Sequence, residues 1–156
     1  MVYPILAIWA GFCALQDANQ KKISNYLTLP ACLVALVWLL FNGTTLVGSS
    51  SGQAITAAIM TLAITLPGYV LGKMGAGDVK MLLALSLATD QRYLLWTIAL
   101  AGLAMLVWAL GIHRAWPRLP PPFRAKINRL SPENIKSPPY APFIFLGFIL
   151  SPWLLK

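Results

Sequence analysis

Residues 93–112 read YLLWTIALAGLAMLVWALGI and contain no charged side chain. A helix that crosses the hydrocarbon core of a bilayer needs about 20 mainly apolar residues, so this segment alone predicts a transmembrane helix. The rest of the chain is similar in character, since 58% of its 156 residues are hydrophobic, 10% are charged and the mean hydropathy is +0.71. Soluble proteins are about half apolar and about a quarter charged. We therefore expect a single integral membrane domain over residues 1–156.

Six apolar runs are separated by short polar segments. They cover residues 2–15, 26–41, 54–71, 79–88, 93–112 and 140–155. The first and fourth are shorter than a full crossing, and either polar neighbours complete them or the fourth lies partly inserted among other helices. The predicted fold class is all-α, a polytopic membrane bundle of about six transmembrane or partly inserted helices.

The Lys and Arg residues sort to one side of the membrane if all six runs cross it. Ten of the twelve share that side, and only Arg92 and Lys156 fall on the other. Cytoplasmic loops are enriched in Lys and Arg, so the first side is predicted to be cytoplasmic and both termini to lie outside. The cytoplasmic set is Lys21, Lys22, Lys73, Lys80, Arg114, Arg118, Arg124, Lys126, Arg129 and Lys136. A net charge of +8 divided among short loops does not indicate a nucleic-acid partner.

Residues 113–139 are the longest polar connection, and they are basic and rich in Pro. Such a composition predicts an extended cytoplasmic connector that lies near anionic lipid headgroups. A short helix can begin after Ser131, with Ser131 as its N-cap and Pro132 at its first position. His113 is expected to be an isolated interfacial residue of this loop.

Two of the four acidic residues, Asp17 and Asp78, fall at the predicted cytoplasmic ends of the first and fourth runs. Asp78 lies in the sequence GAGDVK at residues 75–80, where the glycines permit close packing and a helix that begins near Val79 favours a carboxylate at its N-terminus. Alone, Asp78 can be a helix cap and Asp17 a turn residue. Together they predict an aspartyl dyad, because close like charges leave one carboxyl protonated while the other is anionic.

These residues resemble the aspartic prepilin peptidases of the membrane, the type IV prepilin peptidase family. That family carries Gly-x-Gly-Asp with a Lys two positions on, as residues 75–80 do. Asp17 followed by KKISN at 21–25 is similar to the family's first aspartate and the basic and Ile-Pro-Asn-like residues after it. PYAPFIFLG at 139–147 is similar to the start of the family's last span. Ser24 and Ala141 replace the usual Pro and Gly.

The resemblance implies a multi-pass aspartic endopeptidase of the inner (cytoplasmic) membrane. It cuts the short basic leader from prepilins or pseudopilins at the cytoplasmic face, with Asp17 and Asp78 activating water. The implied partners are the substrate helix and membrane lipid, and no metal or organic cofactor is implied. Substrate binding or support of the motif is implied for Gly75, Gly77, Lys80 and Asn25. The paired Cys-x-x-Cys motifs of larger family members are missing. We therefore expect the short, peptidase-only form of tight-adherence (Flp-type) pilus systems, without methyltransferase activity.

Two other classes of function remain open. A small ion- or proton-coupled transporter would use Asp17 and Asp78 as binding sites, although both lie near one face and no internal repeat is present. A non-catalytic assembly factor would bind pilin helices without cutting them, although a scaffold gains nothing from two costly carboxyls in a membrane. Ion flux in liposomes without cleavage indicates the first, and intact prepilin in the wild-type reaction indicates the second.

Overall fold

The computed structural model describes residues 2–134 and 138–155, and its regular structure is helical. Over these residues the α-helices are α1 (Val2–Gln20), α2 (Asn25–Asn42), α3 (Ser51–Val70), α4 (Ala76–Ala88), α5 (Gln91–Ala115), α6 (Pro121–Lys126) and α7 (Ala141–Leu154). Three single 3-10 turns, η1 (Trp116–Arg118), η2 (Asn128–Leu130) and η3 (Pro132–Asn134), lie between α5 and α7. Within the described part of the chain, the predicted all-α fold is confirmed.

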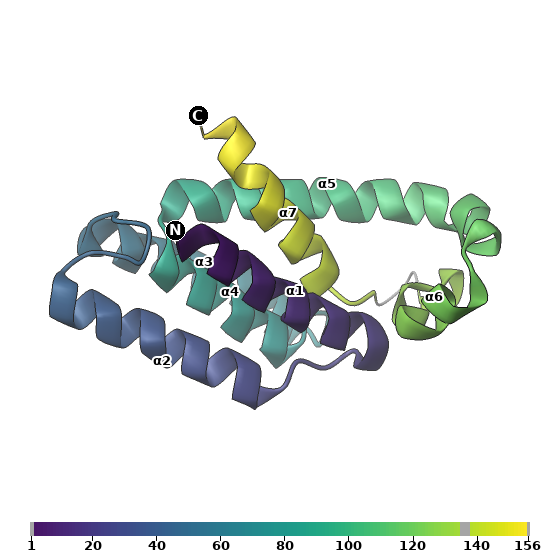
Figure 1. Ribbon diagram of the computed structural model, residues 1–156, viewed down its shortest axis with the longest axis horizontal. Helices are drawn as coiled ribbons and strands as arrows, with labels where there is room; N and C mark the ends of the chain where they lie inside the picture. The colour runs from purple at the N-terminus through teal and green to yellow at the C-terminus, as the bar shows by residue number, and fades with distance from the viewer. Residues whose placement is uncertain (1, 135–137, 156) are drawn as a thin grey trace.

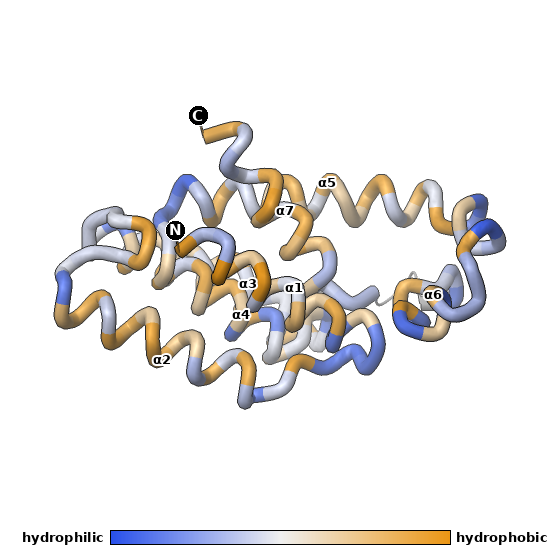
Figure 2. Tube along the Cα trace, in the orientation of Figure 1, coloured by the Kyte–Doolittle hydropathy of each residue, from blue (hydrophilic) through white to orange (hydrophobic). Residues whose placement is uncertain are grey.

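The exterior of the bundle suits lipid. Within the described residues, three helical segments are long and apolar enough to cross a membrane: Asn25–Asn42, Ser51–Val70 and Gln91–Arg118. Large apolar side chains on several helices face outward, and Ile8, Leu33 and Leu110 are 63%, 61% and 76% exposed. Figure 2 shows hydrophilic segments gathered mainly at the ends of the helices and in their connections. These features describe a helical membrane protein.

Helix α4 occupies the centre of the bundle. It packs against α2 and α3 and also contacts α1, α5 and α7, while α7 packs between α1 and α5 (Figure 1). Eight of its 13 residues are buried, including Met81, Leu82 and Leu85. Because the other helices surround α4, it does not need the length of a helix that faces lipid across the whole membrane. The fourth apolar run is therefore a core element of the bundle.

Helices α5 and α7 approach each other closely at Gly147. A methyl group on Gly147 would lie 2.9 Å from the backbone nitrogen of Ala101 and nearer still to the carbonyl oxygen of Thr97. Small residues at helix crossings allow such backbone contact in membrane bundles, where packing replaces the hydrophobic effect. The crossing holds the first turn of α7 in position beside α1.

Connections alternate between the two ends of the bundle. The α1–α2 turn, the α3–α4 turn and the described residues between α5 and α7 lie at one end, which we call the aspartate end because Asp17 and Asp78 are there (Figure 1). The α2–α3 loop and the α4–α5 turn lie at the opposite end. There Asp90 caps α5 by accepting hydrogen bonds from the backbone of Arg92 and Tyr93, and it also accepts one from the Ser49 hydroxyl at 3.0 Å.

The expectation of an extended connector over residues 113–139 is wrong for residues 113–134. Helix α5 continues to Ala115, so His113 lies in its last turn, and the described residues that follow form short helical turns. Pro121 and Pro132 each begin such a turn, where the N–H that proline lacks has no intrahelical partner. The turn at Pro132 begins where the sequence predicts it. Residues 135–137, and with them Lys136, lie outside the described residues.

Candidate active site

Asp17 lies in the last turn of α1 and is 3% exposed. Its Oδ2 accepts a hydrogen bond at 3.0 Å from the backbone N–H of Ala141, the first residue of α7. The first N–H groups of a helix have no partner within the helix, so this carboxyl acts as a cap for α7. The packing of α1 on α7 therefore fixes the position of Asp17.

Asp78 is the third residue of α4, because the helix begins at Ala76 and not near Val79. The side chain is 5% exposed, and its Oδ2 accepts a hydrogen bond at 3.2 Å from the backbone N–H of Gly75. Its Oδ1 is buried and has no hydrogen-bond partner among the described residues. Buried polar atoms are nearly always paired, so this oxygen has an unmet capacity for a hydrogen bond.

Asp17 and Asp78 line the same pocket at the aspartate end, with a volume of about 330 Å³. The sequence-predicted residues Gly75, Gly77, Lys80 and Asn25 line it as well. The remaining lining residues are Lys21, Lys22, Ile23 and Ala76. The structure thus brings all six predicted site residues together, from the ends of α1, α2 and α4. Their catalytic and binding roles remain predictions.

Gly77 lets α4 approach the α1–α2 turn. A methyl group at this position would lie 2.9 Å from Ile23 Cβ and 3.3 Å from the Ile23 backbone nitrogen. Such distances are shorter than normal contacts, so only glycine allows this separation without a shift. Because Asp78 follows Gly77 directly, the close approach sets the position of the Asp78 carboxyl relative to the turn that follows Asp17.

Lys80 and Asn25 connect α4 to the start of α2 at the rim of the pocket. The Lys80 Nζ donates a hydrogen bond to Asn25 Oδ1 at 2.9 Å, and this bond is exposed. Asn25 is the first residue of α2, and Ser24 is its N-cap, with Ser24 Oγ accepting from the Tyr26 N–H at 3.2 Å. Among the described residues, no three His, Cys, Asp or Glu side chains lie close enough together to hold a metal ion.

The two carboxyls differ in their electrostatic surroundings. Both lie just outside the apolar runs 2–15 and 79–88, at the polar ends of their helices. Burial, and next the negative charge of Asp17, raise the pKa of Asp78 to about 7, although the Gly75 N–H and the charge of Lys21 oppose the rise. Burial also raises the pKa of Asp17, against the Ala141 N–H and Lys21. Asp78 is therefore well placed to carry a proton near neutral pH.

The backbone N–H of Ala141 is part of the site, and the residue types in the sequence do not predict it. It lies 124 residues from Asp17 in sequence and meets it only through helix packing. The signal for it is the similarity of PYAPFIFLG at residues 139–147 to the start of the last span in prepilin peptidases. That segment places a helix N-terminus against Asp17.

A sequence model described as the type IV leader peptidase family matches residues 4–110, which is more than half of the chain and includes both aspartates. The chain belongs to the type IV leader peptidase family. The predicted family is confirmed, and the membership supports a peptidase. Neither the curated proteins nor the solved structures contain a significant match to this leader peptidase. Ala141, the α7 residue that donates to Asp17, lies beyond the matched region.

Proposed function

We propose that this leader peptidase is an aspartic endopeptidase of the inner membrane. Its substrates are prepilins or pseudopilins, and it removes their short basic leader at the cytoplasmic face. The observation that carries the proposal is the meeting of Asp17 and Asp78 in one pocket, both nearly fully buried, with one Asp78 oxygen unpaired within the described residues. Buried carboxyls with raised pKa values in a pocket are typical of acid–base sites.

The surroundings of the two carboxyls support different roles for them in this proposal. Asp17 is the anion, since it accepts the N–H of Ala141 at the N-terminus of α7, where negative charge is favoured. Asp78 carries the proton, because its burial and the charge of Asp17 both favour the neutral form. Asp17 takes a proton from water as the water oxygen attacks the scissile carbonyl carbon, and Asp78 gives its proton to the carbonyl oxygen. When the C–N bond breaks, Asp17 returns its proton to the leaving amine, and the hydroxyl proton of the intermediate goes back to Asp78.

The basic residues around the pocket support the cytoplasmic location. Lys21, Lys22 and Lys80 line the pocket, and Lys73 lies in the turn that precedes α4. Lys and Arg gather in the cytoplasmic loops of membrane proteins, so the aspartate end is proposed to face the cytoplasm. The peptide bond that is cut then lies at the membrane surface, where the polar leader of the substrate meets its apolar helix.

The test is leader release from a cognate prepilin in lipid vesicles. Asp17→Asn and Asp78→Asn keep side-chain size, and each is expected to lower the release rate by at least about 100-fold, as loss of an acid or base does. Asp90→Asn is the matched control, because Asp90 caps α5 at the opposite end of the bundle. It is expected to cleave at the wild-type rate. Either pocket variant cleaving at near the wild-type rate would refute the dyad.

A further inference from the structure

A second cavity of this leader peptidase is an open groove between α1 and α2 with α4 as its floor. Its volume is about 550 Å³, and its lining side chains are apolar or aromatic. Trp9 in the wall has no free donor, since its indole N–H donates to the carbonyl oxygen of Leu27 at 2.9 Å. The peptidase chemistry described above uses none of these residues. We call this cavity the α1–α2 groove.

The α1–α2 groove has the length and the surface of a site for a helix. Its α2 wall extends from Tyr26 to Trp38, and at about 1.5 Å per residue these 12 steps span about 18 Å. Four alanines line it, but Ala35, Ala84 and Ala88 are only 1–2% exposed and lie where α2 packs on α4, whereas Ala31 on α2 is partly exposed. Small residues let the backbones of membrane helices approach closely, and Ala31 gives a docked helix such a position on α2.

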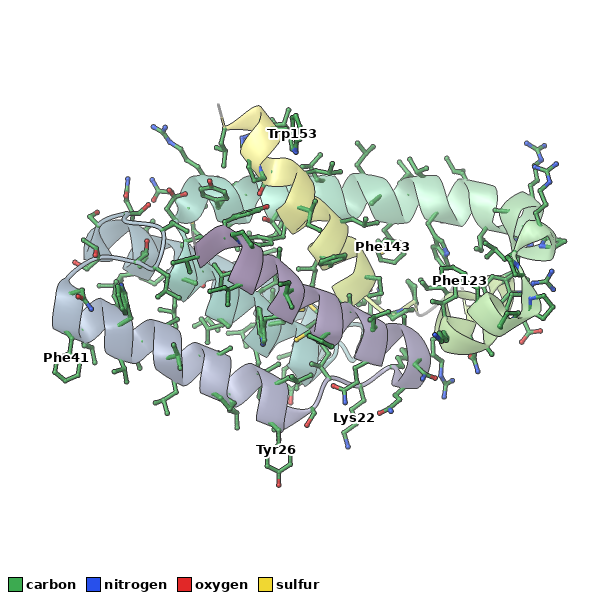
Figure 3. All side chains as sticks on the ribbon, viewed as in Figure 1. Lys22, Tyr26, Phe41, Phe123, Phe143 and Trp153 are labelled. Atoms are coloured by element: carbon green, nitrogen blue, oxygen red, sulfur yellow. The ribbon has the colours of Figure 1, made fainter. Side chains whose placement is uncertain are left out.

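The groove and the pocket that holds the aspartates border the same polar cavity beside the α1–α2 turn. Tyr26 lines both the groove and a polar cavity beside the α1–α2 turn. Lys22 and Asn25 line that polar cavity and the aspartate pocket as well. Figure 3 shows Tyr26 at the start of α2 and Lys22 projecting from the adjacent turn. Tyrosine is enriched where apolar membrane meets water, so this point marks the level at which an apolar helix gives way to a polar chain.

We propose that the α1–α2 groove binds the apolar helix of the substrate, with the N-terminal end of that helix at Tyr26. This inference rests on the proposed function and deepens it by naming the surface that recognises the membrane-embedded part of the substrate. A helix in the groove extends from the aspartate end toward the opposite end, and the residues before it pass Lys22 into the aspartate pocket. A lipid chain would occupy the groove without any use for the neighbouring aspartate pocket.

Photo-cross-linking tests the occupant directly. Benzoylphenylalanine replaces Val34 in the groove or, as the matched control, Ile59 on α3; these side chains are 59% and 62% exposed. Both proteins carry Asp78→Asn so that the prepilin stays intact in vesicles of phosphatidylethanolamine and phosphatidylglycerol. Position 34 is expected to cross-link to the apolar helix of the prepilin and position 59 is not. Capture of lipid alone, of a second copy of the peptidase, or of prepilin equally at both positions overturns the inference.

A kinetic arm uses active enzyme and separates this inference from the proposed function. Ala31→Trp fills the groove and is expected to raise KM and lower kcat/KM for the prepilin about tenfold or more. Ala63→Trp, at an exposed position of α3, is expected to leave cleavage unchanged. Unchanged kinetics in Ala31→Trp, or the same loss in both variants, overturns the groove inference. Failure of the wild type to cleave any prepilin instead refutes the proposed function.

Discussion

Gly77→Ala moves the Asp78 carboxyl without removing it. The added methyl group would lie 2.9 Å from Ile23 Cβ, whereas carbon atoms in contact are normally about 3.5–4.0 Å apart. The N-terminus of α4 and the α1–α2 turn must then separate by about 0.6–1.1 Å. A displacement of about 1 Å at reacting groups costs about 100-fold in rate. We expect kcat/KM for leader release to fall by about that factor, with overpacking costing about 1–3 kcal/mol of stability.

The assay measures leader release by purified enzyme in vesicles, normalised to the folded fraction from tryptophan fluorescence during thermal unfolding. Gly102→Ala on α5 is the control, because no described atom within the range of normal contact, 4 Å, would meet its methyl group. It is expected to keep the wild-type rate. If Gly77→Ala unfolds at the wild-type temperature and cleaves at the wild-type rate, the close contact between α4 and Ile23 does not position Asp78.

Three further outcomes follow from the structure. The pH profile of kcat/KM is expected to be bell-shaped. The value of kcat/KM falls as pH rises through about 7, where Asp78 loses its proton, and it falls in acid because Asp17 gains one. A flat profile from about pH 6 to 9 contradicts the assignment of the proton to Asp78. Asp90→Ala removes the cap of α5 and the bond from Ser49, so thermal unfolding is expected to show a loss of about 1 kcal/mol while leader release is unchanged. Gly147→Ala forces α7 away from α5, and circular dichroism is expected to show a lower unfolding temperature; an unchanged temperature contradicts the close packing.

The helices could be predicted from the sequence, but some of their ends could not. Apolar runs locate α1 to α5 and α7, because lipid leaves few alternatives to a helix. Helix α1 extends past its apolar run to Gln20, and α4 begins at Ala76. Both additions are polar or small residues that make specific hydrogen bonds: Asp17 accepts the N–H of Ala141 on α7, and Asp78 accepts the N–H of Gly75 at the start of its own helix. Hydropathy carries no information about such contacts.

The placement of the two aspartates at one site could be predicted from the sequence, but the difference between their surroundings could not. Alternation of the loops is enough to place Asp17 and Asp78 at one end of the bundle. The N–H of Ala141 reaches Asp17 only because α7 packs between α1 and α5, and the burial of Asp78 depends on Gly77 lying against Ile23. The α1–α2 groove is also a property of packing, since its walls come from segments that look alike in sequence.

The most direct test of the dyad compares the two single Asn variants with the Asp17→Asn, Asp78→Asn double variant. Leader release from prepilin in vesicles is measured for each under single-turnover conditions. Residues that act as one catalytic unit show strongly non-additive losses. We expect either single variant to lose nearly as much rate as the double variant. Losses that multiply, or a single variant that cleaves at near the wild-type rate, would contradict a shared proton-transfer role for Asp17 and Asp78.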